Sequence, residues 1–213
     1  MPYFKNDKIN ILFIHVPKTG GSSFEIYLSK KYNIPLNNNS LFSKQNNNIM
    51  PNELKKISLQ HQTFQNIKNN KDILNINFEN IKIISFVRNP YERLISDLFF
   101  YKIINIDTNV DTIPNIILKY IRASPSTYDN HNIPQNNFLI DSSNKLYENI
   151  TIIKTENLTN SLINIGFYDF NINNEQVNKY GKIDYYKYLN KESIKHINNH
   201  YCKDFELFKY KKL

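Results

Sequence analysis

Two adjacent glycines, Gly20 and Gly21, most narrow the folds open to this chain, which has only four glycines in 213 residues. Residues 11–16 before them are apolar and mostly β-forming, which predicts a strand. Residues 22–28 after them place aromatic and aliphatic side chains at helical spacing. Glycine adopts backbone angles closed to other residues and lets N–H groups approach a ligand closely. The segment therefore predicts a strand, a tight turn and a helix.

The turn also has the chemistry of a phosphate cradle. The start of a helix offers unpaired N–H groups and a partial positive charge, and Lys18 adds a full positive charge. It is not the standard P-loop, because the Walker pattern places its lysine after the glycines. The alternative at this point is an ordinary Gly-Gly turn beside a surface lysine.

A second strand–loop–helix unit follows. Residues 81–87 form another short β-branched run, long enough for a buried strand. Asn89 is a good N-cap and Pro90 fits the first turn of a helix. The helix predicted after them has one face suited to a core, made by Leu94, Ile95, Leu98 and Tyr101.

Arg88 lies between this strand and this helix, at the edge where open α/β sheets bind ligands. Its planar guanidinium suits a phosphate, and Ser96 further along the helix has a hydroxyl for the same anion. Two alternatives stay open: an ion pair from Arg88 to Glu92 or Asp97, and an ordinary solvated helix serine at Ser96.

Together the two units resemble the cofactor-binding segments of sulfotransferases that use 3′-phosphoadenylyl sulfate (PAPS). Residues 17–23 (P-K-T-G-G-S-S) resemble the loop for the 5′-phosphosulfate, and residues 87–96 (V-R-N-P-Y-E-R-L-I-S) resemble the segment for the 3′-phosphate. Their order and spacing are similar to the carbohydrate branch, which includes heparan-sulfate 2-O- and chondroitin-type enzymes and small bacterial and viral relatives. Four later runs resemble further family motifs: Q-H-Q-T-F at 60–64, P-Q-N-N-F-L at 134–139, K-T-E-N-L at 154–158 and the tail at 201–210. Lys154 stands where the family has arginine.

The resemblance implies a PAPS-dependent enzyme that passes a sulfuryl group to a hydroxyl acceptor, here expected to be a carbohydrate, and releases 3′,5′-ADP without a metal. His61 matches the family's catalytic histidine and would accept the acceptor's proton. Lys18 would stabilise the leaving group. The residues implied for PAPS are Lys18, Thr19, Gly20, Gly21, Ser22, Ser23, Arg88 and Ser96.

The other four histidines receive different expectations. His15 lies at the end of the first predicted strand and is expected to be structural, whereas His131 lies in a polar loop where it would meet substrate. That loop belongs to residues 103–135, a candidate acceptor wall that also includes Arg122, Tyr128 and Asn130. His196 and His200 fall on the predicted last helix and are expected to be solvated.

The remaining elements predict one α/β domain over residues 1–213, a P-loop-like three-layer fold with a central parallel sheet flanked by helices. Residues 112–121 are expected to form a short helix, residues 149–154 a third strand, and one helix to run from near Asn190 through Phe208. Residues 33–51 are low in complexity and are expected to form a mobile loop.

Composition limits the class of protein further. No run reaches the length of a membrane span, no signal peptide begins the chain, and the single Cys202 forms no internal disulfide, so a cytoplasmic enzyme is expected. The net charge of +8 fits an anionic cofactor, whereas the lack of tryptophan and of an Arg-rich stripe argues against a specific nucleic-acid partner.

Two rival functions remain open at this stage. A nucleotide kinase-like phosphotransferase would need a carboxylate for magnesium at the end of the second strand, where the chain has Arg88. A non-catalytic module that binds 3′,5′-ADP or a polyanion needs only the pocket.

Overall fold

The computed structural model describes residues 2–43, 50–172 and 183–213. Its centre is a four-stranded sheet in the order β1-β2-β3-β4, formed by β1 Tyr3–Lys5, β2 Asn10–Ile14, β3 Lys82–Val87 and β4 Ile150–Lys154. β2, β3 and β4 pair in parallel, as the α/β prediction requires. β1 pairs antiparallel with β2 and was not predicted, because three residues are too few to show a period.

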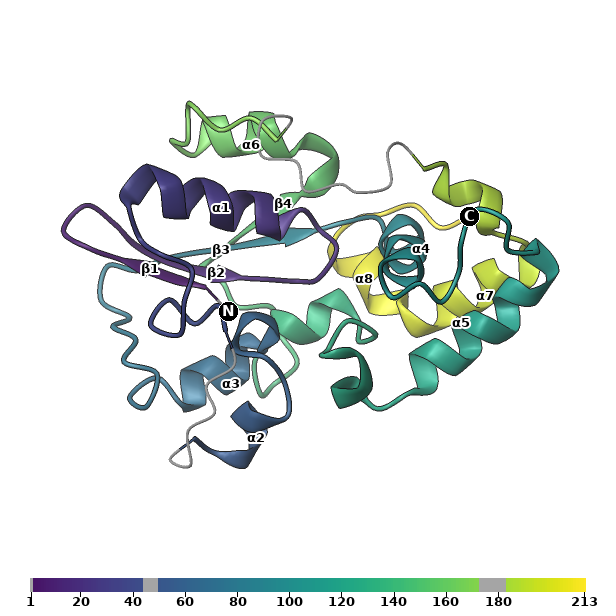
Figure 1. Ribbon diagram of the computed structural model, residues 1–213, viewed down its shortest axis with the longest axis horizontal. Coiled ribbons are helices and arrows are strands. Elements are labelled where there is room, and N and C mark those ends of the chain that lie inside the picture. The colour runs from purple at the N-terminus through teal and green to yellow at the C-terminus, as the bar shows by residue number, and fades with distance from the viewer. Residues whose placement is uncertain (1, 44–49, 173–182) are drawn as a thin grey trace.

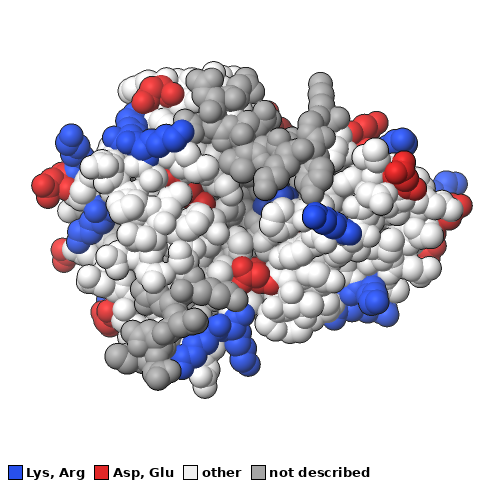
Figure 2. All heavy atoms as spheres, in the orientation of Figure 1, with Lys and Arg blue, Asp and Glu red and all other residues white. Residues whose placement is uncertain are grey.

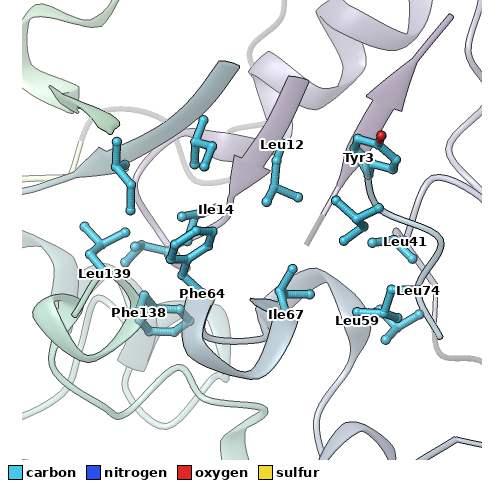
Figure 3. Close-up of a cluster of buried hydrophobic side chains, with 14 of the residues drawn as sticks. Tyr3, Leu12, Ile14, Leu41, Leu59, Phe64, Ile67, Leu74, Phe138 and Leu139 are labelled. Atoms are coloured by element: carbon cyan, nitrogen blue, oxygen red, sulfur yellow. The ribbon is translucent and has the colours of Figure 1, made fainter. Parts of the chain in front are cut away.

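Alternation along β2 divides the core between the two faces of the sheet. Ile11 and Phe13 pack toward α1 Gly21–Tyr32 and α6 Leu158–Asn164, which cover the upper face in Figure 1. Leu12 and Ile14 point to the other face, where Phe64 and Ile67 of α3 Phe64–Asn69 pack against them (Figure 3). The period of two in a strand thus produces the three predicted layers.

A third hydrophobic cluster lies beyond the carboxyl ends of the strands, on the right of Figure 1. It is built from α4 Pro90–Phe100, α5 Ile113–Arg122, α7 Lys191–His200 and α8 Cys202–Leu207. Asn89 caps α4 by accepting a hydrogen bond from the N–H of Tyr91, as its sequence position predicts. The remaining elements are α2 Asn52–Lys55 and the 3₁₀ turns η1 Leu59–His61, η2 Val110–Thr112, η3 Pro125–Tyr128, η4 Gln135–Phe138, η5 Thr155–Asn157 and η6 Tyr185–Tyr188.

The expectation of one continuous last helix is wrong. Tyr201 adopts non-helical angles (φ −103°, ψ 23°) and separates α7 from α8. The break allows the buried Asp204 carboxylate to accept hydrogen bonds from the N–H groups of Gln135 and Asn136, both at 2.8 Å. The helical period of the tail does not show this break, because it goes with hydrogen bonds to residues far away in the chain.

The predicted loop at residues 33–51 contains no helix or strand in its described part, and residues 44–49 lie outside the description. None of the helices in the described ranges combines the length and apolar character that crossing a bilayer requires.

Candidate active site

The loop between β2 and α1 has the geometry expected of an anion cradle. Lys18 and Gly20 both have positive φ, +66° and +86°. Gly20 is the N-cap of α1 and supplies no side-chain acceptor for the first N–H groups of the helix. At Gly21 a Cβ would lie 2.8 Å from Nε2 of His15 and 2.9 Å from Cε1 of Phe13. The glycine pair is therefore required twice, once by conformation and once by close approach.

Two threonines attach this loop to the sheet. The buried Thr19 hydroxyl donates to the Val16 carbonyl at 2.7 Å, so any contact from Thr19 to an anion must come from its backbone N–H. The Thr155 hydroxyl shares its proton between the carbonyls of Thr19 at 2.7 Å and Val87 at 3.1 Å. Thr155 belongs to the K-T-E-N-L run at residues 154–158, and its hydrogen bonds explain why that run lies under the loop and supports it.

One face of α4 lies against Lys18. Glu92, Ser96 and Phe100 follow Arg88 at intervals of four residues and therefore share a helix face. At one end, Nη1 of Arg88 makes a long 3.5 Å contact to the Lys18 carbonyl; at the other, the Lys18 ammonium lies 4.2 Å from the centre of the Phe100 ring. Ser96 lies half-buried between them.

Burial and the neighbouring charges act on the pKa of Lys18 in opposite directions. Burial lowers the pKa of Lys18 and the positive charge of Arg88 lowers it further, while Asp97 opposes both. Arg88 itself pairs with Glu92 at 3.0 Å and lies over the Tyr185 ring. The ion pair that the sequence left as an alternative for Arg88 is therefore present, and an anion at this place would share the guanidinium with Glu92.

His61 is held by a carboxylate from a distant loop. Its Nδ1–H donates to Asp129 at 2.8 Å, and among the described residues no group is hydrogen-bonded to its Nε2. Burial lowers the pKa of His61 to about 3; the Asp129 hydrogen bond opposes this shift, and the neighbouring His15 and His131 reinforce it. His61 is thus a neutral imidazole with Nε2 available as a proton acceptor.

Three histidine rings form a row with His61 in the middle. His15 meets His61 edge to face at 5.2 Å between ring centres, and His131 does so from the other side at 4.7 Å. Each outer ring has its own buried carboxylate: His15 donates from Nδ1 to Glu25 at 2.5 Å and His131 to Asp97 at 2.7 Å. Within the described residues, no group of three or more His, Cys, Asp or Glu side chains is arranged to hold a metal ion.

The row connects the loop between β2 and α1 to α4. His15 approaches Gly21 at one end, and at the other His131 stacks on Phe100 with 5.4 Å between ring centres and an interplanar angle of 11°. Phe100 in turn carries the Lys18 ammonium. Lys18, Phe100, the three histidines and Gly21 therefore form one continuous set of contacts.

The structure places the other predicted residues at different distances from the site. Asn130 lies beside the site and donates to the carbonyl of His61 at 2.9 Å, whereas Arg122 is exposed at the end of α5, in a shallow hollow with Asn115 and Lys119. The expectation that His200 is solvated is wrong, because it is half-buried and its Nε2 donates to the Asn132 carbonyl at 3.2 Å.

Arg93 is one of the residues that the sequence analysis did not single out. It is 1 % exposed, and its guanidinium donates to the carbonyls of Pro17 at 3.0 Å, His131 at 2.7 Å and Ile133 at 3.1 Å. It therefore joins the loop between β2 and α1 to the loop that carries His131. The only signal in the sequence is an arginine in the helical run that was otherwise read as a core face.

Gln135 explains the P-Q-N-N-F-L run. Its buried side chain accepts from the N–H of Arg88 and donates to the Arg88 carbonyl, both at 2.8 Å, so it fixes the backbone from which the Arg88 side chain projects.

Comparison with protein-family models gives a match to the sulfotransferase family over residues 1–139. The chain belongs to the sulfotransferase family. The matched span contains the loop between β2 and α1, His61, α4 and the loop that carries His131. No curated protein and no solved structure matched the chain.

Proposed function

We propose that this member of the family transfers a sulfuryl group from PAPS to the hydroxyl group of a carbohydrate. The observation that carries the proposal is the run of contacts from Lys18 through Phe100 and His131 to the His61–Asp129 pair. A cation suited to an anionic leaving group and a neutral base suited to an incoming hydroxyl thus belong to one site. PAPS supplies the sulfuryl group on a phosphate leaving group.

The residues present fit such a donor. The N–H groups of residues 19–23, at the start of α1, and the Lys18 ammonium suit the 5′-phosphosulfate, because both favour negative charge. Arg88, just before α4, and Ser96, on α4, would hold the 3′-phosphate. The long contact of Nη1 to the Lys18 carbonyl leaves Arg88 a donor that an anion can take up while Glu92 stays paired.

In the reaction, His61 accepts the proton of the acceptor hydroxyl at Nε2 while that oxygen bonds to sulfur. Lys18 neutralises the charge that develops on the bridging oxygen as its bond to sulfur breaks. Asp129 keeps the proton of His61 on Nδ1, so that Nε2 remains an acceptor. In-line transfer depends mainly on such positioning and charge stabilisation.

Ligand stabilisation tests the donor half of the proposal. 3′,5′-ADP at a hundred times its Kd should stabilise the protein by about 2.7 kcal/mol, which is measured as a rise in Tm. 5′-AMP lacks the 3′-phosphate and should bind more weakly. Arg88→Ala should abolish this preference, and Lys203→Ala on the exposed side of α8 should retain it. Stabilisation by ATP with magnesium and not by 3′,5′-ADP would instead favour a kinase-like enzyme.

Transfer of a radiolabelled sulfuryl group from PAPS to the acceptor tests the catalytic half of the proposal. His61→Ala should lower turnover by about 10²- to 10⁴-fold while the affinity for 3′,5′-ADP stays unchanged. Retained turnover would remove His61 from the mechanism. Binding of 3′,5′-ADP without transfer to any hydroxyl acceptor would support the non-catalytic module.

A further inference from the structure

Phe100 is a large apolar side chain that the proposed reaction has not used. It is the last residue of α4 and is 50 % exposed. Single exposed apolar residues are common and need no explanation by themselves. Phe100 differs from such residues because its ring is restrained by three neighbours: His131 stacks on it, Tyr101 meets it edge to face at 5.1 Å, and the Lys18 ammonium lies over it.

The restraint continues into the protein interior. His131, which backs Phe100, is 5 % exposed and is fixed by its hydrogen bond to Asp97. Asp97 is buried and also accepts a hydrogen bond from the Tyr120 hydroxyl. An exposed aromatic ring with a fixed orientation is preorganised for a flat partner, because little side-chain freedom remains to be lost on binding.

The ring also lies where an acceptor must arrive. Lys18, the group proposed for the leaving oxygen, contacts the ring directly, and His61, the proposed base, is one ring away through His131. The sulfuryl group passes between the two sites at which these residues act. Phe100 therefore borders the point of transfer.

The surroundings of Phe100 indicate which kind of acceptor fits. Lys18, Ser96 and the His61–Asp129 pair offer charges and hydrogen-bonding groups around a single apolar surface. A phenol or a lipid chain favours an apolar slot that encloses it on several sides. A pyranose ring has one face of C–H groups and a rim of hydroxyls, which matches a half-exposed aromatic ring within a polar rim.

We propose that Phe100 is the stacking platform for the acceptor and a specificity-determining residue, and that the group it receives is the C–H face of a pyranose ring next to the hydroxyl that is sulfated. The inference rests on the proposed function, whose donor half has its own test in 3′,5′-ADP binding.

The absence of tryptophan from the chain gives a direct experiment. Phe100→Trp places a single fluorophore at the proposed platform, and Tyr168→Trp places one at a site that is 78 % exposed beyond α6. Both variants, saturated with 3′,5′-ADP, are titrated with unsulfated chondroitin and heparosan hexasaccharides, cellohexaose and chitohexaose. A tyrosine-containing peptide and glycerol serve as comparisons. At least one saccharide should cause a saturable emission change in Phe100→Trp and none in Tyr168→Trp.

The kinetic counterpart uses Phe100→Leu and Phe100→Tyr. With the saccharide that binds, Phe100→Leu should raise the KM for the acceptor at least tenfold and change the Kd for 3′,5′-ADP less than twofold, and Phe100→Tyr should restore the KM. A tenfold loss of 3′,5′-ADP affinity in Phe100→Leu would assign the ring to the donor and overturn the proposal. Emission that responds to the peptide alone, or to no saccharide, would overturn it as well. If the protein binds no 3′,5′-ADP, the result contradicts the proposed function itself and not only the role of Phe100.

Discussion

At the scale of single residues, Gly21 is constrained by volume rather than by backbone angle. A Cβ at this position would lie within 3 Å of His15 and Phe13, and neither neighbour is free to move, because Glu25 holds His15 and Phe13 is fully buried. Gly21→Ala should therefore cost about 1–3 kcal/mol of unfolding free energy, as overpacking does, even though alanine is the better helix former. Urea denaturation measures it.

Gly166→Ala is the matched control for this prediction. Gly166 has φ +102° and nothing within 4 Å of an added Cβ, so its substitution carries backbone strain of about 1–2 kcal/mol and no clash. Both variants should lose stability, and only Gly21→Ala should also weaken 3′,5′-ADP binding. A Gly21→Ala protein with wild-type affinity would contradict the role given to the loop.

Asp129 is predicted to act through His61 as a positioning residue. Its carboxylate accepts hydrogen bonds from the N–H and hydroxyl of Ser58, both at 2.6 Å, besides that from His61. Burial alone raises the pKa of Asp129, but these hydrogen bonds outweigh it and hold the pKa below its usual value. Asp129→Asn should lower kcat by about 10²-fold and leave the KM for PAPS nearly unchanged. The exposed Asp111→Asn is the control, and a raised KM for PAPS with kcat intact would count against this role.

At the scale of elements, Arg93 joins α4 to two loops that carry different parts of the site. Arg93→Ala would leave the carbonyls of Pro17, His131 and Ile133 without their donor in a buried place, so the loss should be about 3 kcal/mol or more. Arg93→Lys keeps the charge but loses the planar fork, so it should restore stability only in part. Denaturation of both variants checks this, with the exposed Arg122→Ala expected to stay near wild type. An Arg93→Ala protein of wild-type stability would show that the loops hold themselves.

Whether a feature could be predicted from the sequence depends on how far apart along the chain the interacting residues lie. The strand–turn–helix at Gly20 and Gly21 and the capped helix at Asn89 are local, and the sequence predicted where the strand and both helices start to within one residue. The partners that complete the site come from far along the chain: Asp129 lies 68 residues from His61, and Thr155 lies 136 residues from Thr19. No period or motif in a single sequence indicates such pairings, and for the same reason the break at Tyr201 was not foreseen.

At the scale of the whole molecule, the site lies where three hydrophobic clusters meet. The cluster above the sheet supports α1, the one below it continues into the segment before α3 that carries His61, and the third supports α4. The net charge of +8 is spread out: on the face in Figure 2, Lys and Arg of the described residues alternate with Asp and Glu instead of forming one patch. The proposal that an anionic donor binds therefore depends on the local charge of Lys18 and Arg88 and not on a basic patch on this face.

This arrangement predicts how the stability of the molecule responds to acid. His61 is buried and its pKa is lowered to about 3, and burial also lowers the pKa of His200, whereas in the unfolded chain both have a pKa near 6.5. Below about pH 6.5 the unfolded chain binds protons that the native state does not, so stability should fall with pH by up to about 1.4 kcal/mol per pH unit for each histidine. Asp129 stays ionised in both states down to about pH 5, because its native pKa lies below the unfolded one.

Urea denaturation at pH 7, 6 and 5 separates the contribution of His61 from the rest. His61→Gln removes one of the groups that must stay neutral, so its unfolding free energy should fall less steeply with pH than that of the wild type, and the two curves should converge toward pH 5. His200→Gln is the matched variant, since His200 is half-buried on α7 and its pKa is lowered for the same reason. Parallel curves for the wild type and His61→Gln would mean that His61 already binds a proton near pH 6.5. In that event its Nε2 would lose its proton-accepting form near pH 6.5, and turnover would fall below that pH.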